Sequence, residues 1–221
     1  MTEDFSRRPI ASRNTRWAAH VTRRLVEEGV APNRISAGSV VAAALAGAAF
    51  ALSAQVSALW AAGLLLVLGA AFTQLRLLCN LFDGLVAVEG GMGTPDGAFW
   101  NEVPDRLSDL IILAGFGAAA GWPALGLLAG ALAILTAYLR EFGRAAGLGS
   151  DFRGPGAKSH RMAAVTAGAL LQVGAWLSGA AWPVLTWTLV LVLALTAITT
   201  VRRSRRILRG LSGRADGSNL G

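Results

Sequence analysis

Long apolar stretches alternate with short polar or glycine-rich segments along most of the chain. Six of these stretches are close to or longer than the roughly 20 residues that a helix needs to cross a bilayer. We place the six predicted transmembrane helices at residues 34–54, 58–88, 98–120, 123–146, 160–180 and 183–207. The pattern therefore predicts an all-α, polytopic membrane protein with a single domain.

The segment before the first apolar stretch has a different pattern, with apolar and basic residues interleaved. Its apolar positions include Ile10, Trp17, Val21 and Leu25, and its basic positions include Arg13, Arg16, Arg23 and Arg24. This pattern is typical of an amphipathic helix on the cytoplasmic membrane surface, and an ordinary solvated helix is the alternative. We divide the domain, 1–221, into an interfacial helix at 1–31, a membrane core at 32–210 and a cytoplasmic tail at 211–221.

The composition agrees with membrane insertion, because 54% of the 221 residues are hydrophobic and only 15% are charged. The net charge of +7 raises the question of a nucleic-acid partner. The basic residues flank apolar stretches, however, so anionic lipid and loop topology explain them better. We therefore expect a membrane partner and no nucleic acid. The single Cys79 excludes an intramolecular disulfide.

The basic residues also predict the orientation of the chain. The links at 53–57, 121–123 and 178–183 contain no charged residue, whereas Lys and Arg cluster at the opposite ends of the apolar stretches. Because positive loops remain in the cytoplasm, both termini are expected there, in a plasma (inner) membrane protein.

Polar residues interrupt the apolar pattern at the end of the second stretch and the start of the third. Asn80 and Asp83 are three residues apart, and Asn101, Asp105 and Asp109 recur every four, so each set lies on one helix face. Ionisable groups at membrane depth indicate a functional site. Carboxylate and amide oxygens suit hard divalent cations. For Asp109, an ion pair with Arg106 or Arg76 is the alternative role.

The spacing resembles the signature of the CDP-alcohol phosphotransferase family, membrane enzymes that make phospholipids. That signature reads Asp-x-x-Asp-Gly-x-x-Ala-Arg, eight further residues, and Gly-x-x-x-Asp-x-x-x-Asp. The positions that match it without a gap are Asp83, Gly84, Ala87, Gly97 and Asp105. The positions that depart from it are Asn80 and Asn101, where the family has Asp, and Val88, where it has Arg.

The resemblance implies transfer of a phosphatidyl group from a CDP-linked lipid such as CDP-diacylglycerol to a small alcohol, with release of CMP. It also implies Mg²⁺ or Mn²⁺ as cofactor, a homodimer, and Asp105 as catalytic base. The implied metal ligands are Asn80, Asp83, Asn101 and Asp105. The implied nucleotide-binding residues are Asn33, Ser36, Asp83, Gly84, Ala87 and Gly97. For Asn33, capping of the first membrane helix is an equal alternative.

A second cluster of basic residues surrounds the link between the fourth and fifth stretches. Arg140, Arg144, Lys158 and Arg161 carry donors that can grip an anionic group. Family members that use phosphorylated alcohols bind the acceptor phosphate in this region, so we expect a phosphorylated acceptor. The alternative is that these residues only flank membrane helices. His160 is interpreted as a polar flank and not as a base.

Two other functions remain open from the sequence. The departures at Asn80, Asn101 and Val88 favour a non-catalytic lipid-binding, nucleotide-binding or regulatory paralogue of the same fold. A small transporter is a third hypothesis, but transport sites lie near the midplane of the bilayer and this polar group lies at one end.

Overall fold

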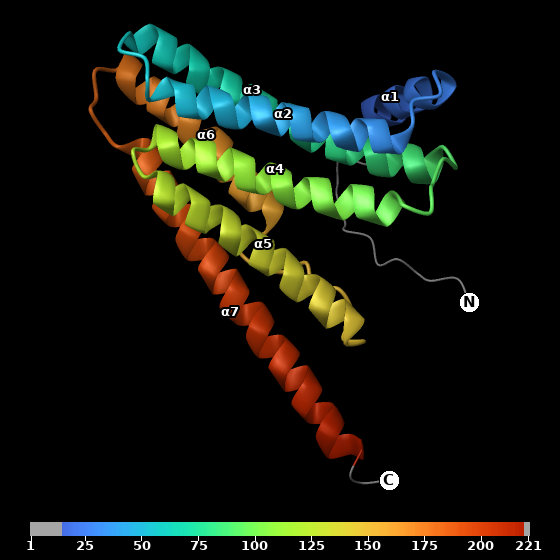
Figure 1. Cartoon of the computed structure of the whole chain (residues 1–221). Helices are drawn as coiled ribbons and strands as arrows, with labels where there is room; N and C mark the ends of the chain where they lie inside the picture. The colour runs from blue at the N-terminus through green and yellow to red at the C-terminus, as the bar shows by residue number, and fades with distance from the viewer. Residues whose placement is uncertain (1–14, 219–221) are drawn as a thin grey trace.

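The computed structural model describes residues 15–218, with side chains through Gly213, and Figure 1 shows its helical bundle. This part of the chain forms seven α-helices and no strand, which confirms the all-α prediction. The helices are α1 (Arg16–Glu27), α2 (Pro32–Ser53), α3 (Leu59–Glu89), α4 (Gly97–Ala119), α5 (Pro123–Ala145), α6 (Lys158–Leu177) and α7 (Val184–Ser218).

Each of the six apolar stretches forms one helix, and most predicted ends lie within a few residues of the observed ones. The largest difference is α7, which continues to Ser218, so the segment interpreted as a tail from residue 211 begins as helix. Basic residues at the end of α7 keep good helix propensity, so the helix does not stop with the apolar pattern. The predicted interfacial segment is helical from Arg16, and its part at residues 1–14, with Ile10 and Arg13, lies outside the described residues.

Four helices, α2, α3, α5 and α7, are long and apolar enough to cross a membrane. The predicted spans at α4 and α6 do not reach this standard in the described chain. They carry ionisable residues among their apolar ones, including Asp105, Arg106 and Asp109 in α4 and Lys158 and Arg161 in α6. Three of these residues, Asp105, Lys158 and Arg161, are candidate site residues in the sequence.

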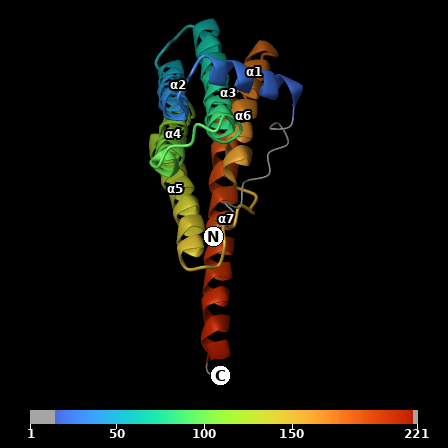
Figure 2. The same cartoon turned by 90° about the vertical axis from the view of Figure 1, so that its right-hand side faces the viewer.

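The helices form a bundle whose two ends differ in chemistry. α2 packs on α3 and α4, α5 joins α4 to α7, and α6 lies against α3 and α7. The links α2–α3, α4–α5 and α6–α7 gather at one end, while α1 and the links α3–α4 and α5–α6 lie toward the other (Figures 1 and 2). Between them, the buried core includes Phe50 and Phe116, whose rings meet edge-on at 5.4 Å.

The tightest contact in the bundle joins α2 and α4 through two glycines. A Cβ atom on Gly115 would lie 2.2 Å from the carbonyl oxygen of Gly47. Small residues let helix backbones approach closely, which increases van der Waals contact without a hydrophobic driving force. This contact fixes α4, and with it the polar side chains on α4, against the rest of the bundle.

We expect Gly115→Ala to destabilise the folded protein by about 1–3 kcal/mol, because the added methyl group overlaps backbone atoms that cannot move aside. The measurement is thermal unfolding of the purified protein in detergent. Gly174→Ala is the matched control, since a Cβ atom there meets no atom within 4 Å. Equal melting temperatures for the two variants would contradict the close α2–α4 contact.

Candidate functional site

Asp83 occupies a buried position where α3 packs against α2. Its Oδ2 accepts a hydrogen bond of 2.7 Å from the Ser36 hydroxyl. Its Oδ1 is also buried and has no hydrogen-bond partner within the described structure. An unpaired buried carboxylate oxygen is costly unless a cation or water satisfies it. Asp83 therefore offers one anionic oxygen to a ligand.

Arg76 joins Asp105 and Asp109 of α4 to α3. Its side chain has no solvent exposure, and its Nη2 donates to Asp105 Oδ1 at 2.6 Å and to Asp109 Oδ1 at 2.8 Å. Arg161 of α6 donates to Asp109 Oδ2 at 2.6 Å. Asp109 thus pairs with Arg76 and Arg161, and the expected alternative with Arg106 does not form. Both oxygens of Asp109 are engaged, so its role is to hold three helices together.

Lys158 stands at the first position of α6 and reaches across to α3 and α4. Its Nζ donates to Asn80 Oδ1 and to Asp105 Oδ1. Asn80 and Asp105 were both expected to be metal ligands, whereas Lys158 was expected in the acceptor site. The fold therefore brings residues from two predicted sites into direct contact.

A third set of ion pairs closes the side of the site next to α5. Arg106 donates to Asp105 Oδ2 at 3.1 Å and also pairs with Glu102. Arg140 of α5 donates to Glu102 at 2.5 Å, and its guanidinium lies over the ring of Phe152, 5.1 Å from the centroid. Glu102 therefore neutralises two arginines beside Asp105 instead of contributing to a metal site.

Two cavities open along this basic side. A small cavity of about 40 Å³ has Asp105 in its wall, together with the basic residues Arg106, Arg140, Lys158, Arg161 and Arg203. A larger cavity of about 210 Å³ lies between α5, the α5–α6 loop and α7. Arg140 and Arg203 line both cavities, so the two spaces adjoin.

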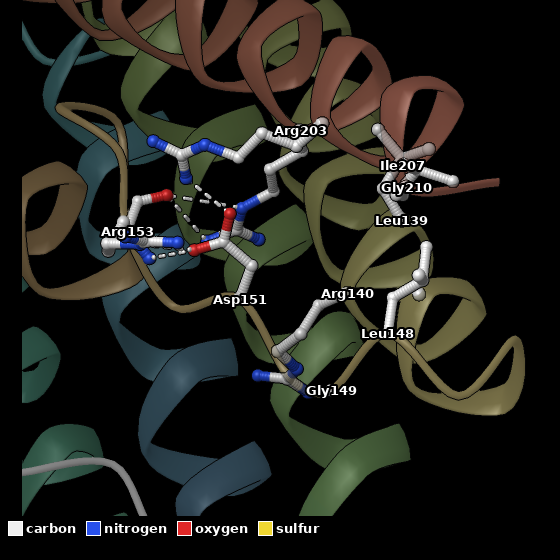
Figure 3. A pocket seen from close by; sticks show the side chains of 11 residues that line it. Leu139, Arg140, Leu148, Gly149, Asp151, Arg153, Arg203, Ile207 and Gly210 are labelled. Carbon is white, nitrogen blue, oxygen red and sulfur yellow. Dashed lines mark hydrogen bonds and ion pairs between the residues drawn. The ribbon is translucent and has the colours of Figure 1, made fainter. Parts of the chain in front are cut away.

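Figure 3 shows how the larger cavity is built. Arg153 and Asp151 come from the α5–α6 loop and face Arg203 of α7, which donates to the Arg153 carbonyl oxygen at 3.4 Å. Burial would raise the pKa of Asp151, but hydrogen bonds from the Arg153 backbone N–H and the Arg206 guanidinium lower it below the usual value. Asp151 therefore stays ionised and holds the basic loop against α7.

Some expected residues lie away from this centre. Asn33 does not cap α2, whose N-cap is Ala31. Its side chain donates to the Asp96 carboxylate at 3.3 Å, at the start of α4. Arg144 is exposed and pairs with Glu141 at 2.9 Å. The remaining expected residues differ in solvent exposure: Asn101 is exposed, whereas Gly84, Ala87 and Gly97 are partly buried.

The sequence does not select Arg203 or Arg206, and it names Arg76 only as an alternative ion-pair partner of Asp109. Arg76 lies within an apolar stretch one turn before Asn80, and Arg203 and Arg206 lie in a basic run that topology alone explains. The i, i+4 spacing of Arg76 and Asn80 on α3 is the one available signal. No comparable pattern marks Arg203, because its partner atoms belong to a distant loop and to α5.

The fit of these residues to a divalent cation differs between two positions. No three His, Cys, Asp or Glu side chains lie together as a metal site in the part of the chain that the structure describes. Beside Asp83, the buried unpaired Oδ1 is an anionic oxygen of the kind that a divalent cation prefers as a ligand. Between Asn80 and Asp105, the Lys158 ammonium already fills the cation position.

The fold is shared with solved structures of phosphatidylinositol phosphate synthase from Mycobacterium tuberculosis. The structure with CDP-DAG bound has a TM-score of 0.71 and 22% identity, over 87% of this chain and 94% of that one. The complex with manganese and citrate has a TM-score of 0.70 and 22% identity, over 86% and 88% of the chains. The apo form gives 0.67 and 22%, over 86% and 95%.

No family model and no curated protein sequence matches the chain. At 22% identity the structural likeness shows a common fold. The chain is thus an all-helical protein with the fold of these synthases.

Proposed function

We propose that this protein belongs to the CDP-alcohol phosphotransferase family and is a phosphatidyltransferase of phospholipid biosynthesis. It transfers the phosphatidyl group of a CDP-diacylglycerol-like lipid to a small phosphorylated alcohol and releases CMP. The observation that carries this proposal is the cavity in which Asp105 faces Arg106, Arg140, Lys158, Arg161 and Arg203. A carboxylate base beside a concentrated group of cations suits an acceptor that has both a hydroxyl and a phosphate. The shared fold with a synthase solved with CDP-DAG supports the donor class.

The reaction requires a proton acceptor at the attacking hydroxyl. Asp105 Oδ1 accepts from Arg76 and Lys158, while Oδ2 accepts only from Arg106 and keeps acceptor capacity. The acceptor hydroxyl gives its proton to Asp105 as its oxygen bonds to the lipid-linked phosphorus. The bond from that phosphorus to the oxygen of the CMP phosphate breaks, and CMP leaves with the electron pair. Arg76 holds the carboxylate in place throughout.

The cofactor in this proposal is one Mg²⁺ or Mn²⁺ ion, which Asp83 Oδ1 would hold together with the amide oxygen of Asn101, since the Asn80 oxygen already accepts from Lys158. When bound, it neutralises diphosphate charge on the donor lipid. The synthase solved in complex with manganese supports this choice of metal. The nucleotide site remains proposed at Asn33, Ser36, Asp83, Gly84, Ala87 and Gly97, and the hydrogen bond from Ser36 to Asp83 supports it.

In the membrane, we place six spans, α2 to α7, with α1 on the surface and the candidate site and both termini in the cytoplasm. The proposed division of the domain stays at 1–31 for the interfacial segment, 32–210 for the membrane core and 211–221 for the cytoplasmic tail. We also propose the homodimer that the family resemblance implies. The four apolar spans and the neutral links at one end of the bundle support this membrane arrangement. An even number of spans also returns the chain to the side on which it began.

The test is an assay of the purified protein with CDP-diacylglycerol, Mg²⁺ or Mn²⁺, and matched pairs of free and phosphorylated alcohols. We expect CMP release that requires the acceptor and is faster with phosphorylated members. CMP release with no acceptor dependence would contradict transferase activity. Absence of CMP release with every acceptor, in a protein that still binds CDP-diacylglycerol, would instead favour a non-catalytic paralogue, which the engaged state of Asp105 and Asn80 also allows.

The orientation predicts that a cysteine at Ser178, in the link between α6 and α7, reacts from outside the cell. Ser178→Cys in a Cys79→Ala background should be labelled by an impermeant thiol reagent in intact cells. Ser159→Cys, exposed at the start of α6, is the matched control and should react only after lysis. The reverse result would place the site outside.

Arg140 and Arg144, near the end of α5, are expected to differ in their contribution to acceptor binding. Arg140 lines both cavities and Arg144 lines neither of them. Arg140→Ala should raise the acceptor KM tenfold or more, since a hydrogen bond to a charged group contributes about 1.5–3 kcal/mol. Arg144→Ala is the control for loss of a surface charge and should change KM little. Equal KM values for Arg140→Ala and the unmodified protein would leave membrane topology as the role of Arg140.

A further inference from the structure

The site contains an ammonium group, that of Lys158, in addition to the residues expected to bind metal. Its Nζ lies between Asn80 Oδ1 on α3 and Asp105 Oδ1 on α4 and donates to both. Its side chain is 14% exposed, so solvent has little access to it. The protein therefore holds a cation of its own between two residues that stand at ligand positions of the family signature.

The charges around Asp105 leave little attraction for an additional cation there. Its oxygens already accept from Arg76, Arg106 and Lys158. A divalent ion placed between Asn80 and Asp105 would compete with Arg76 and Lys158 for Asp105 Oδ1 and would lie against an ammonium group. In a partly dry site this repulsion is strong.

The residue types at the signature positions agree with this arrangement. Asn80 and Asn101 each stand where the signature has Asp, so the site lacks two negative charges. That loss equals the charge of one divalent cation. The amide oxygen of Asn80 can accept a hydrogen bond from the Lys158 ammonium group. It carries no negative charge, so it attracts a metal ion less than the carboxylate of the signature would.

Many sites that transfer phosphoryl groups hold two divalent ions about 4 Å apart. We propose that Lys158 takes the place of one such ion, so that the protein binds a single divalent cation, at Asp83. The role of Lys158 toward the substrate rests on the proposed function, whereas the number of bound cations can be tested without it. An ammonium group has three N–H donors, and two are used by Asn80 and Asp105. Since Lys158 also lines the small cavity, the third can reach an anionic group of the substrate there. Lys158 is thus a positioning residue for Asp105 and a fixed cation for phosphate oxygens.

The experiment counts Mn²⁺ ions bound per chain by electron paramagnetic resonance, on purified protein without substrate. We expect one ion for the native protein and for Asn80→Asp, because Lys158 remains in place. The double variant Asn80→Asp with Lys158→Met should bind two, since the ammonium group is gone and a carboxylate is restored. Arg144→Met removes an exposed cation at the same end of the bundle and should still bind one.

Two ions, or none, in the native protein would overturn the proposal, and so would one ion in a folded double variant. Thermal unfolding of each variant shows whether it is folded, and the native count stands even if the double variant is not. The outcome is distinguishable from failure of the proposed function. A native protein with one Mn²⁺ and no CMP release would retain the role of Lys158 and reject the enzyme, whereas two ions with CMP release would do the opposite.

Discussion

Asp105→Asn is expected to reduce kcat for CMP release by about 10²–10⁴-fold, the usual contribution of a general base. The amide keeps the shape of the carboxylate but cannot take the proton of the acceptor hydroxyl. The substitution also removes the negative charge of the carboxylate to which Arg76, Arg106 and Lys158 donate. The KM for the CDP-lipid should change much less, because Asp105 acts on the acceptor. Initial rates at saturating donor and acceptor measure the effect.

The control for Asp105→Asn is Glu28→Gln, which makes the same carboxylate-to-amide change at an exposed position after α1. Its rate should match that of the unmodified protein. Both variants should keep a cooperative unfolding transition, because Arg76 retains Asp109 as a partner. Native turnover in a folded Asp105→Asn protein would remove Asp105 from the chemistry.

Asp83→Asn is expected to abolish Mn²⁺ binding and CMP release together. Asp83 carries the only buried carboxylate oxygen without a partner among the residues that the structure describes. The Coulomb attraction between unit charges 4 Å apart is about 4 kcal/mol at an effective dielectric constant of 20. Loss of this charge should therefore weaken binding of a divalent ion by about 1,000-fold or more. Titration with Mn²⁺, followed by the CMP assay, measures both effects on the same sample.

Ser36→Ala provides the graded comparison for this prediction. It removes the hydrogen bond to Asp83 Oδ2 and leaves Oδ1 untouched. A hydrogen bond to a charged group contributes about 1.5–3 kcal/mol, so metal affinity should change measurably but by less than in Asp83→Asn. If Asp83→Asn bound Mn²⁺ as tightly as the native protein, the metal position at Asp83 would be wrong.

Local patterns in the sequence predict the helices of this protein and the end of the bundle at which its polar residues gather. Apolar runs of membrane length fixed six helices, because hydrophobic length is a local property of the chain. The 3.6-residue period placed Asn80 with Asp83, and Asn101 with Asp105 and Asp109, on single helix faces. The gapless spacing from Asp83 to Asp105 also pointed to the fold that the solved synthases share.

The contacts between side chains of different helices depend on how the helices pack, and local patterns do not predict them. The rotation of each helix about its axis, fixed by contacts such as Gly47 against Gly115, brings Arg76 to Asp105 and Lys158 to Asn80. These partners come from separate segments, and no local period relates them. These contacts also change the role proposed for a residue. Lys158 can act as a cation between Asn80 and Asp105 because α3, α4 and α6 converge at one end of the bundle. No single stretch of sequence specifies that convergence.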